Sequence, residues 1–277
     1  DIFRPDVGTA GAASERFPVI MTIGPYMKDK LWVPPPDLEE QPNPYMNWEC
    51  VNPLWWCPRG YALLRVDTRG SGKSPGKSDP SSYSEAVDAY DCIEWVARQP
   101  WCNGAVGACG ISYHAAFQWR VAGLQPPSLK AIIPWEGRAD LYRDQTFHGG
   151  VFAMGFLANW IATNMAHHIM GKPRSYNPGA FNNNMLWNWA TNNLDSEFWR
   201  ARSADWSKTT VPLYSVGNWG GYEVSGRRFP VLHLTAEAIE AVFARHTSGV
   251  ESERIGIVEA EIRSGYSGFV FLTGTAR

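Results

Sequence analysis

The stretch Val106-Gly107-Ala108-Cys109-Gly110-Ile111-Ser112-Tyr113-His114-Ala115-Ala116 decides the fold that we expect for this chain. It predicts a short apolar strand that turns sharply into a helix at Ser112. Such a turn lifts a serine hydroxyl clear of the backbone, toward a base and toward donors for an oxyanion, so it indicates a nucleophile elbow. The stretch alone is weak evidence, because small residues around a serine also occur as plain packing. In addition, His114 replaces the usual second glycine of the motif.

The flanking sequence predicts that strands and helices alternate. Continuous apolar runs indicate buried parallel strands at residues 17–23, 61–66, 105–109 and 129–134. The capping-box pattern Ser82-Tyr83-Ser84-Glu85 begins a predicted helix, and a second helix follows Ser112. This order favours an α/β fold with a mostly parallel, doubly wound sheet. The candidate nucleophile then falls centrally, with at least two strands on either side.

The chain divides into four predicted segments. Residues 1–138 form the first part of an α/β core, and residues 139–207, which are aromatic and rich in asparagine, form a helical cap insertion. Residues 208–221 return to the core, with a buried strand over 211–217, and residues 222–277 form an atypical C-terminal tail. Ligands of an open α/β sheet bind beyond the C-terminal ends of its strands. Tyr26, Asp67, Ser112 and Trp219 are therefore expected to gather there.

Composition indicates a globular protein and argues against polyanionic partners. The 277 residues are 44% hydrophobic and 19% charged, and the formal net charge is −2. This balance gives no excess of basic residues that would bind nucleic acid or an anionic membrane, so a small or neutral ligand is favoured. The sequence leaves the oligomeric state open.

Five cysteines without a C-x-x-C pair indicate neither a disulfide framework nor a zinc site, and a reducing, cytoplasmic compartment fits them best. No stretch of 18 apolar residues could span a bilayer, and the N-terminus lacks the pattern of a signal peptide. Residues 1–5 resemble the end of a strand, which leaves an upstream segment open.

Two further patterns favour structural interpretations. The run Gly70-Ser71-Gly72-Lys73-Ser74 resembles a phosphate loop, but Asp67 stands where the first glycine of that motif belongs, so a tight turn is the better interpretation. His148, His167 and His168 have no carboxylate at metal-ligand spacing. We therefore predict neither a metal nor a cofactor.

Several motifs together resemble the X-Pro dipeptidyl-peptidase and cocaine-esterase family of α/β-hydrolases, also called the CocE/NonD type. The resemblance runs from about residue 2 to residue 219. The motifs that carry it are Gly24-Pro25-Tyr26, Asp67-Thr68-Arg69-Gly70, Asp91-Cys92-Ile93-Glu94-Trp95, Gln99-Pro100-Trp101-Cys102-Asn103-Gly104, Gly110-Ile111-Ser112-Tyr113, Pro126-Pro127-Ser128-Leu129-Lys130-Ala131 and Phe198-Trp199-Arg200-Ala201-Arg202-Ser203.

The resemblance implies an α/β-hydrolase fold and hydrolysis of an ester or amide, with a small-molecule ester or a peptide as substrate. It implies that Ser112 attacks the carbonyl carbon and that the Tyr26 phenol and the Tyr113 backbone N–H form the oxyanion hole. Donors aimed at a developing oxyanion lower the barrier by about 3 kcal/mol each.

The chain departs from the family where the acid and the base belong. The family's acid lies in a Gly-x-Trp-x-Asp segment, and the matching stretch Gly217-Asn218-Trp219-Gly220-Gly221 ends in glycine. No aspartate follows Asp205, so Glu223 is the nearest candidate acid, and His246 has roughly the spacing of the base. We expect no counterpart of the family's C-terminal β-sandwich within residues 1–277.

The tail also differs in composition, because residues 220–277 contain no Trp, Asn, Asp, Lys, Gln, Met or Cys. Two explanations stay open: a translated intron or shifted frame from about Tyr222, or a genuine divergent terminus with a helix over 234–245 and a strand over 267–272.

We therefore predict a serine hydrolase of the esterase or dipeptidyl-peptidase type. The alternative is a truncated core that lacks a competent acid and base. Trp135, Trp160 and Trp219 are candidate substrate contacts, although aromatic residues of a cap more often serve packing. A proline-specific peptidase would also need carboxylates that bind a free amino terminus. Candidates for that role are Glu136, Asp140 and Asp144.

Overall fold

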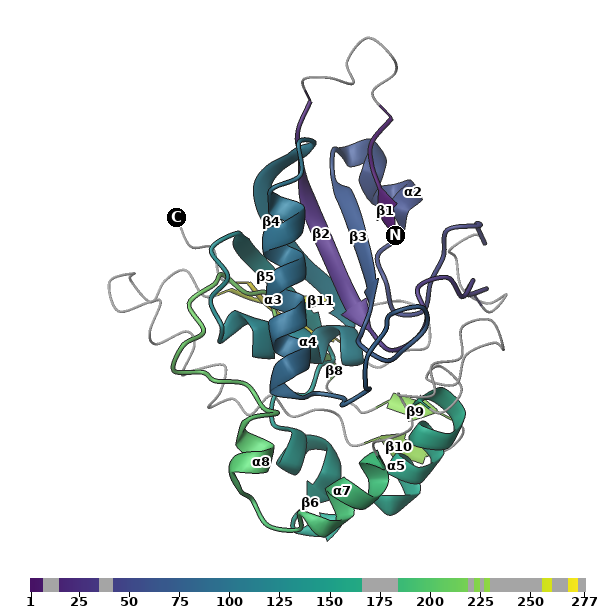
Figure 1. Ribbon diagram of the computed structural model, residues 1–277, viewed down its shortest axis with the longest axis vertical. Helices are drawn as coiled ribbons and strands as arrows, with labels where there is room; N and C mark the ends of the chain where they lie inside the picture. The colour runs from purple at the N-terminus through teal and green to yellow at the C-terminus, as the bar shows by residue number, and fades with distance from the viewer. Residues whose placement is uncertain are drawn as a thin grey trace.

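An eight-stranded, mostly parallel sheet runs through the computed structural model (Figure 1). The structure describes residues 1–6, 15–34, 42–165 and 184–218, together with the backbone of four short strands after residue 221. The strand order is β1-β3-β2-β4-β5-β8-β12-β11. The strand bounds are β1 (Ile2–Phe3), β2 (Phe17–Gly24), β3 (Ala62–Asp67), β4 (Cys102–Ile111), β5 (Leu129–Trp135), β8 (Val216–Asn218), β11 (Gly256–Ala260) and β12 (Phe269–Thr273).

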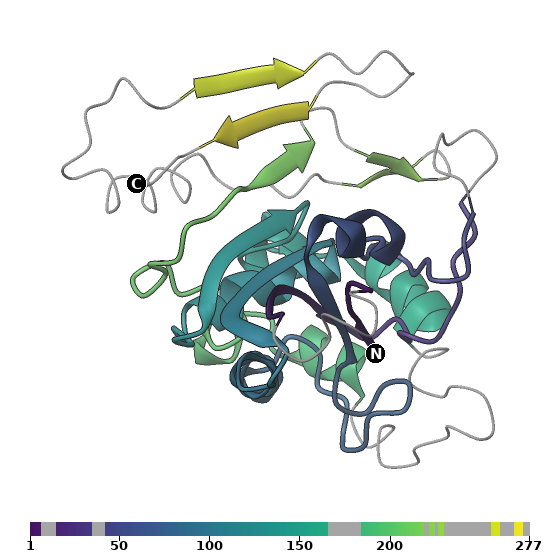
Figure 2. The same ribbon diagram turned by 90° about the horizontal axis from the view of Figure 1, so that it is seen from above.

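The strands around the predicted elbow are parallel. β4 lies between β2 and β5, and it pairs in parallel with both. β3 continues the parallel part beyond β2, while β1 pairs with β3 in the antiparallel sense. On the other side, β8 pairs with β5 in parallel, and β12 and β11 add two antiparallel strands at that edge (Figure 2). The strand before Ser112 is therefore central, as the sequence predicted.

The helices of the core follow from their sequence. α3 (Tyr83–Ala97) begins at Ser82, whose side chain accepts the Glu85 N–H as the capping pattern predicted. α4 (Tyr113–Ala122) begins directly after Ser112 and is buried along its whole length. The side chains of α3 and α4 are joined by an ion pair between Glu85 and Arg120. Before β3 come the short helices α2 (Pro53–Trp56) and η1 (Cys57–Arg59).

A helical segment follows β5. Its elements are η2 (Leu141–Thr146), β6 (Phe147–His148), β7 (Val151–Phe152), α5 (Met154–Trp160), η3 (Ile161–Met165), α7 (Met185–Thr191) and α8 (Glu197–Arg200). α5, α7 and α8 gather at the end of the molecule toward which the arrow of β2 points (Figure 1). This segment lies within the predicted cap, whose bounds at 139 and 207 stay a prediction.

The strand that returns to the core begins later than the sequence suggested. β8 starts at Val216 rather than Val211, and before it only Leu213 makes a bridge, to Ile132. At this bridge the Ile132 N–H donates to the Pro212 carbonyl oxygen and the Tyr214 N–H donates to the Ile132 carbonyl oxygen, each over 3.0 Å. Pro212 has no N–H to donate, so the ladder does not extend from the bridge back toward Val211.

The tail contributes strands whose backbones alone are described. β12 overlaps the strand expected over 267–272, whereas the helix expected over 234–245 lies outside the described residues. β9 (Tyr222–Val224) and β10 (Arg227–Phe229) pair with each other in a separate two-stranded sheet. Among the helices of the described ranges, none is long and apolar enough to cross a membrane.

Candidate active site

Three neighbouring strands end side by side where the sequence placed the site. β2 ends at Gly24, β4 ends at Ile111, and β5 ends at Trp135, which is the register partner of Ile111. Tyr26 and Ser112 follow the first two of these ends. Because side chains that follow parallel strands share one edge of a sheet, the fold brings the Tyr26 and Ser112 side chains together.

Ser112 makes the sharp turn that its sequence predicted. Its backbone angles are φ 58° and ψ −113°, a conformation that residues other than glycine rarely adopt. Such a conformation costs about 1–3 kcal/mol and persists only where its surroundings hold it. Here the Ser112 N–H donates to the Trp135 carbonyl oxygen over 2.9 Å. The Ser112 carbonyl oxygen accepts from the first turn of α4, through the N–H groups of Ala115 and Ala116.

His114 takes the place of the usual second glycine, and the room for it comes from the neighbouring strands. A Cβ on Gly24 of β2 would lie 2.2 Å from His114 Cε1, and one on Gly110 would lie 2.6 Å from His114 Cβ. His114 is buried, and its Nδ1 lies 2.9 Å from the Ile23 carbonyl oxygen. Burial lowers the pKa of His114 to about 4, so the ring is neutral and serves packing.

The Tyr26 phenol lies against the Ser112 hydroxyl. The Trp160 indole N–H donates to the Tyr26 oxygen over 3.2 Å, and a second side-chain hydrogen bond joins Tyr26 to Ser112. An indole N–H can only donate, so the Tyr26 oxygen accepts there and its own proton remains available toward Ser112. Burial raises the pKa of Tyr26, which keeps the phenol protonated as a hydrogen-bond donor.

Tyr113 supplies a backbone donor beside the hydroxyl. It is the first residue of α4, and N–H groups in the first turn of a helix have no partner within the helix. They also lie at the positive end of the helix dipole. The predicted pair of oxyanion donors, Tyr26 and Tyr113, is thus brought to Ser112 from two elements.

Aromatic side chains of the helical segment cover these two tyrosines. Trp160 stacks on Tyr113 with ring centroids 6.2 Å apart. Trp160, Trp189 and Trp199 belong to one buried cluster with Tyr26 and Tyr113. Of the tryptophans predicted as substrate contacts, Trp160 covers the site and packs into this cluster. Trp135 holds the elbow through its carbonyl oxygen, and Trp219 lies outside the described residues.

The predicted acid and base are not located by the structure. Glu223 lies in β9, of which only the backbone is described, and His246 lies outside the described residues. Of the other histidines of interest, His148 contacts the Asp144 carbonyl oxygen, and His167 and His168 also lie outside the described residues. The assignment of acid and base stays a prediction.

The carboxylates considered for an amino-terminus pocket have different surroundings. Asp144 accepts the N–H groups of Ala139 and Asp140, and Asp140 pairs with Arg143, so both stabilise the local turn. Glu136 follows β5 directly, with φ 51°.

Sequence reasoning missed Glu49, which lies beside the elbow. Its carbonyl oxygen accepts the Ile111 N–H over 3.2 Å, and its Oε2 is buried with no hydrogen-bond partner in the described part of the chain. Burial, together with the negative charge of Glu136, raises the pKa of Glu49 well above its usual value. Glu49 lies in a loop without periodicity, so no signal marked it.

The glycine-rich run after β3 is a turn, as its sequence favoured. The Asp67 carboxylate accepts the N–H groups of Lys28 and Lys73, and a Cβ on Gly72 would lie 2.1 Å from Asp67 Oδ2. No cluster of three or more His, Cys, Asp or Glu side chains suited to a metal ion occurs in the ranges that the structure describes.

Comparison with known proteins identifies the family. A family model described as X-Pro dipeptidyl-peptidase (S15 family) matches residues 1–233. The chain belongs to this S15 family. Cocaine esterase from Rhodococcus sp. (strain MB1 Bresler) is 36% identical over 163 residues, which are 58% of this chain and 25% of the esterase.

Solved structures agree with the S15 assignment. A CocE/NonD family hydrolase from Staphylococcus aureus matches with a TM-score of 0.64 and 38% identity over 76% of this chain and 36% of that one. An acylaminoacyl peptidase matches with a TM-score of 0.51 at 15% identity, over 88% of this chain and 32% of that one, and shows the shared fold alone. The fold is that of an α/β-hydrolase, as the sequence predicted. This S15 chain spans about a quarter to a third of the length of these relatives.

Proposed function

We propose that this chain carries the nucleophile and oxyanion hole of a serine hydrolase that cleaves an ester or an amide through an acyl-enzyme on Ser112. The observation that carries the proposal is the strained turn at Ser112, whose hydroxyl is hydrogen-bonded to the Tyr26 phenol. A serine in left-handed backbone geometry between a central strand and a buried helix is expensive to maintain, and such strain clusters at functional sites. Membership of the S15 family supports the same interpretation.

In the proposed reaction the Ser112 oxygen bonds to the substrate carbonyl carbon while its proton passes to a base. The carbonyl oxygen becomes an oxyanion that accepts hydrogen bonds from the Tyr26 phenol and the Tyr113 N–H. Collapse of this intermediate expels the alcohol or amine, which takes the proton, and leaves an acyl-Ser112. Water then repeats the sequence and releases the acid.

The base and the acid of this mechanism are proposed to be His246 and Glu223. The substrate is proposed to be an ester or an X-Pro peptide, bound at the sheet edge beneath Trp160. Family membership and the cocaine esterase relative both support this range of substrates.

A fluorophosphonate probe tests the proposal, because it forms a covalent bond only with an activated serine. We expect the folded chain to be labelled at Ser112 and Ser112→Ala to lose the label. Ser207→Ala is the matched control, because Ser207 is an exposed serine that hydrogen-bonds to Asp205. Absence of labelling in the folded chain would instead support the truncated, catalytically impaired core.

A further inference from the structure

A buried polar network lies directly behind the elbow, and the Tyr113 phenol is at its centre. The Tyr113 hydroxyl lies 2.7 Å and 2.8 Å from the two oxygens of the Glu85 carboxylate, to which it donates. The same phenol oxygen accepts the Ser81 N–H over 3.0 Å. The side chain of the residue that follows the nucleophile is thus held at its far end.

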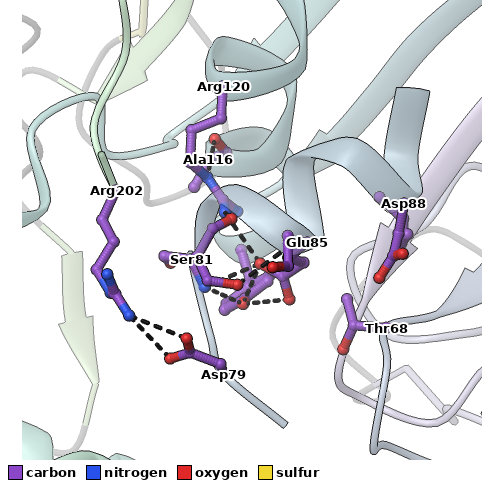
Figure 3. A network of polar contacts seen from close by, with 12 residues as sticks. Thr68, Asp79, Ser81, Glu85, Asp88, Ala116, Arg120 and Arg202 are labelled. Carbon is purple, nitrogen blue, oxygen red and sulfur yellow. Dashed lines mark hydrogen bonds and ion pairs between the residues drawn. The ribbon is translucent and has the colours of Figure 1, made fainter. Parts of the chain in front are cut away.

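Glu85 is itself fixed by several partners (Figure 3). Its Oε2 accepts the Ser81 N–H over 2.8 Å and pairs with the Arg120 guanidinium over 3.0 Å. The Glu85 and Arg120 side chains are 3% and 4% exposed. The Arg138 guanidinium lies 5.1 Å from the Tyr113 ring centre and donates to the Ser81 hydroxyl. The carboxylate therefore has little freedom to move.

Helix capping does not account for this arrangement. In a capping box the glutamate would accept the N–H of the capping residue Ser82, but that N–H donates to the Asp79 carbonyl oxygen. The Glu85 carboxylate turns instead toward the phenol of another helix. Burying an ion pair is also a poor route to stability, because well-packed apolar residues are often at least as stable.

The geometry connects this network to the site. The Tyr113 ring is held at its hydroxyl by Glu85 and stacked on Trp160, and the other end of the same residue carries the N–H that is proposed as an oxyanion donor. Only a few bonds separate the clamped ring from that N–H. A small displacement of a donor weakens transition-state stabilisation steeply, because oxyanion hydrogen bonds depend on preorganised geometry.

We propose that Glu85 is a positioning residue of the oxyanion hole, which sets the place of the Tyr113 N–H by holding the Tyr113 phenol. This inference rests on the proposed function of Ser112. It assigns Glu85 no contact with the substrate.

The rate of Ser112 phosphonylation tests this, because the phosphoryl oxygen of a fluorophosphonate occupies the oxyanion hole during attack. We expect Tyr113→Phe, which removes only the phenol oxygen, to lower the maximal labelling rate about tenfold or more. The apparent dissociation constant of the reversible probe complex should stay within about twofold. Glu85→Gln should have the same effect. The double variant should be labelled no more slowly than the slower single variant, because both changes break the same contact between the Tyr113 hydroxyl and the Glu85 carboxylate.

Asp88→Asn is the matched control. Asp88 lies three residues after Glu85 on α3 and also pairs with an arginine, but its partner Arg69 is on the loop after β3, and Figure 3 shows Asp88 apart from the Glu85 contacts. Its labelling rate should stay within about twofold of the parent chain. Near-UV circular dichroism and the thermal midpoint establish that each variant is folded.

Three outcomes would overturn the inference. The first is a folded Tyr113→Phe that labels at the parental rate, and it decides the matter even if Glu85→Gln fails to fold. The second is a double variant whose loss equals the product of the single losses, which would mean that the two residues act independently. The third is a parent chain that is not labelled at all. That result would contradict the proposed function itself, and this inference, which depends on it, would fail as well.

Discussion

At the scale of single residues, the candidate site contains a tyrosine, Tyr26, whose chemistry is set by its neighbours. Burial raises the pKa of Tyr26 and keeps its phenol protonated, while the Trp160 indole N–H donates to the phenol oxygen and a further side-chain hydrogen bond joins the phenol to Ser112. The sequence placed Tyr26 at a strand end after a proline, and the family resemblance nominated it as an oxyanion donor. Its Trp160 partner lies 134 positions away, and no local pattern connects the two.

Replacement of Tyr26 by phenylalanine should remove one oxyanion donor while it preserves the aromatic packing. We expect the kcat/KM of ester hydrolysis to fall about 10²- to 10³-fold, as for other oxyanion donors. Trp160→Phe is the comparison variant: it removes the indole N–H from the Tyr26 oxygen and reduces the stack on Tyr113, but it leaves the phenol donor in place, so its loss should be smaller. Steady-state kinetics on a chromogenic ester measures both, and a Tyr26→Phe variant within threefold of the parent would exclude Tyr26 from the oxyanion hole.

At the scale of elements, the end of β2 packs directly against the start of α4. In the usual motif a glycine of the helix permits this close approach. Here His114 occupies that position, and the residue without a side chain is instead Gly24 of the strand. The sequence showed the departure from the motif but not its compensation. Compensation of this kind depends on which two elements become neighbours, and only the tertiary structure decides that.

Gly24→Ala should therefore destabilise the protein, because its Cβ would lie within 2.4 Å of two ring atoms of His114. The expected loss of unfolding free energy is about 1–3 kcal/mol, as for other overpacked sites. Gly155→Ala is the matched control: Gly155 lies on α5, nothing lies within 4 Å of its added Cβ, and alanine favours a helix. Thermal or urea unfolding measures the stability of both variants. A Gly24→Ala variant as stable as the Gly155→Ala variant would contradict the proposed contact.

At the scale of the whole molecule, the core and the helical segment meet through polar contacts as well as apolar packing. Arg202, just after α8, donates to both oxygens of the Asp79 carboxylate at 3.0 Å, close to the Ser81 end of the Glu85 network (Figure 3). The buried aromatic cluster also draws on both parts of the chain. Stability of the molecule and order at the site therefore depend on the same contacts.

The buried, neutral His114 predicts how the stability of the molecule depends on pH. Its pKa is about 4 in the folded state and about 6.5 in an unfolded chain, so between these values the unfolded state binds more protons. Stability should fall as the pH falls through this window, by about 3 kcal/mol at pH 4 from His114 alone.

Unfolding free energies at pH 7.5 and pH 4 for the parent chain and for His114→Gln measure this effect. The parent should lose about 3 kcal/mol more than the variant. Buried carboxyls with raised pKa values, such as Asp67 and Asp144, act in the opposite sense but are common to both proteins. Parallel pH profiles would show that His114 does not titrate in this way.

The sequence by itself determined how strands and helices alternate along the chain, the helix that begins at Ser82 and the turn at Ser112. These features depend on local patterns: apolar runs, a capping box, and small residues around a serine. The resemblance to a known family nominated Tyr26 and Tyr113. It could not locate an acid or a base, because the matching stretch ends in Gly221 and the candidate His246 lies in a segment of different composition.

Only the tertiary structure decided what surrounds Ser112. Glu85 matched a capping box in the sequence, yet its carboxylate turns to the Tyr113 phenol, and the unmarked Glu49 lies against the elbow. Both placements arise from how α3, α4 and the loop before β3 pack on the sheet. Sequence patterns encode the period and the ends of an element, whereas contacts between elements far apart along the chain follow from packing, which no local pattern specifies.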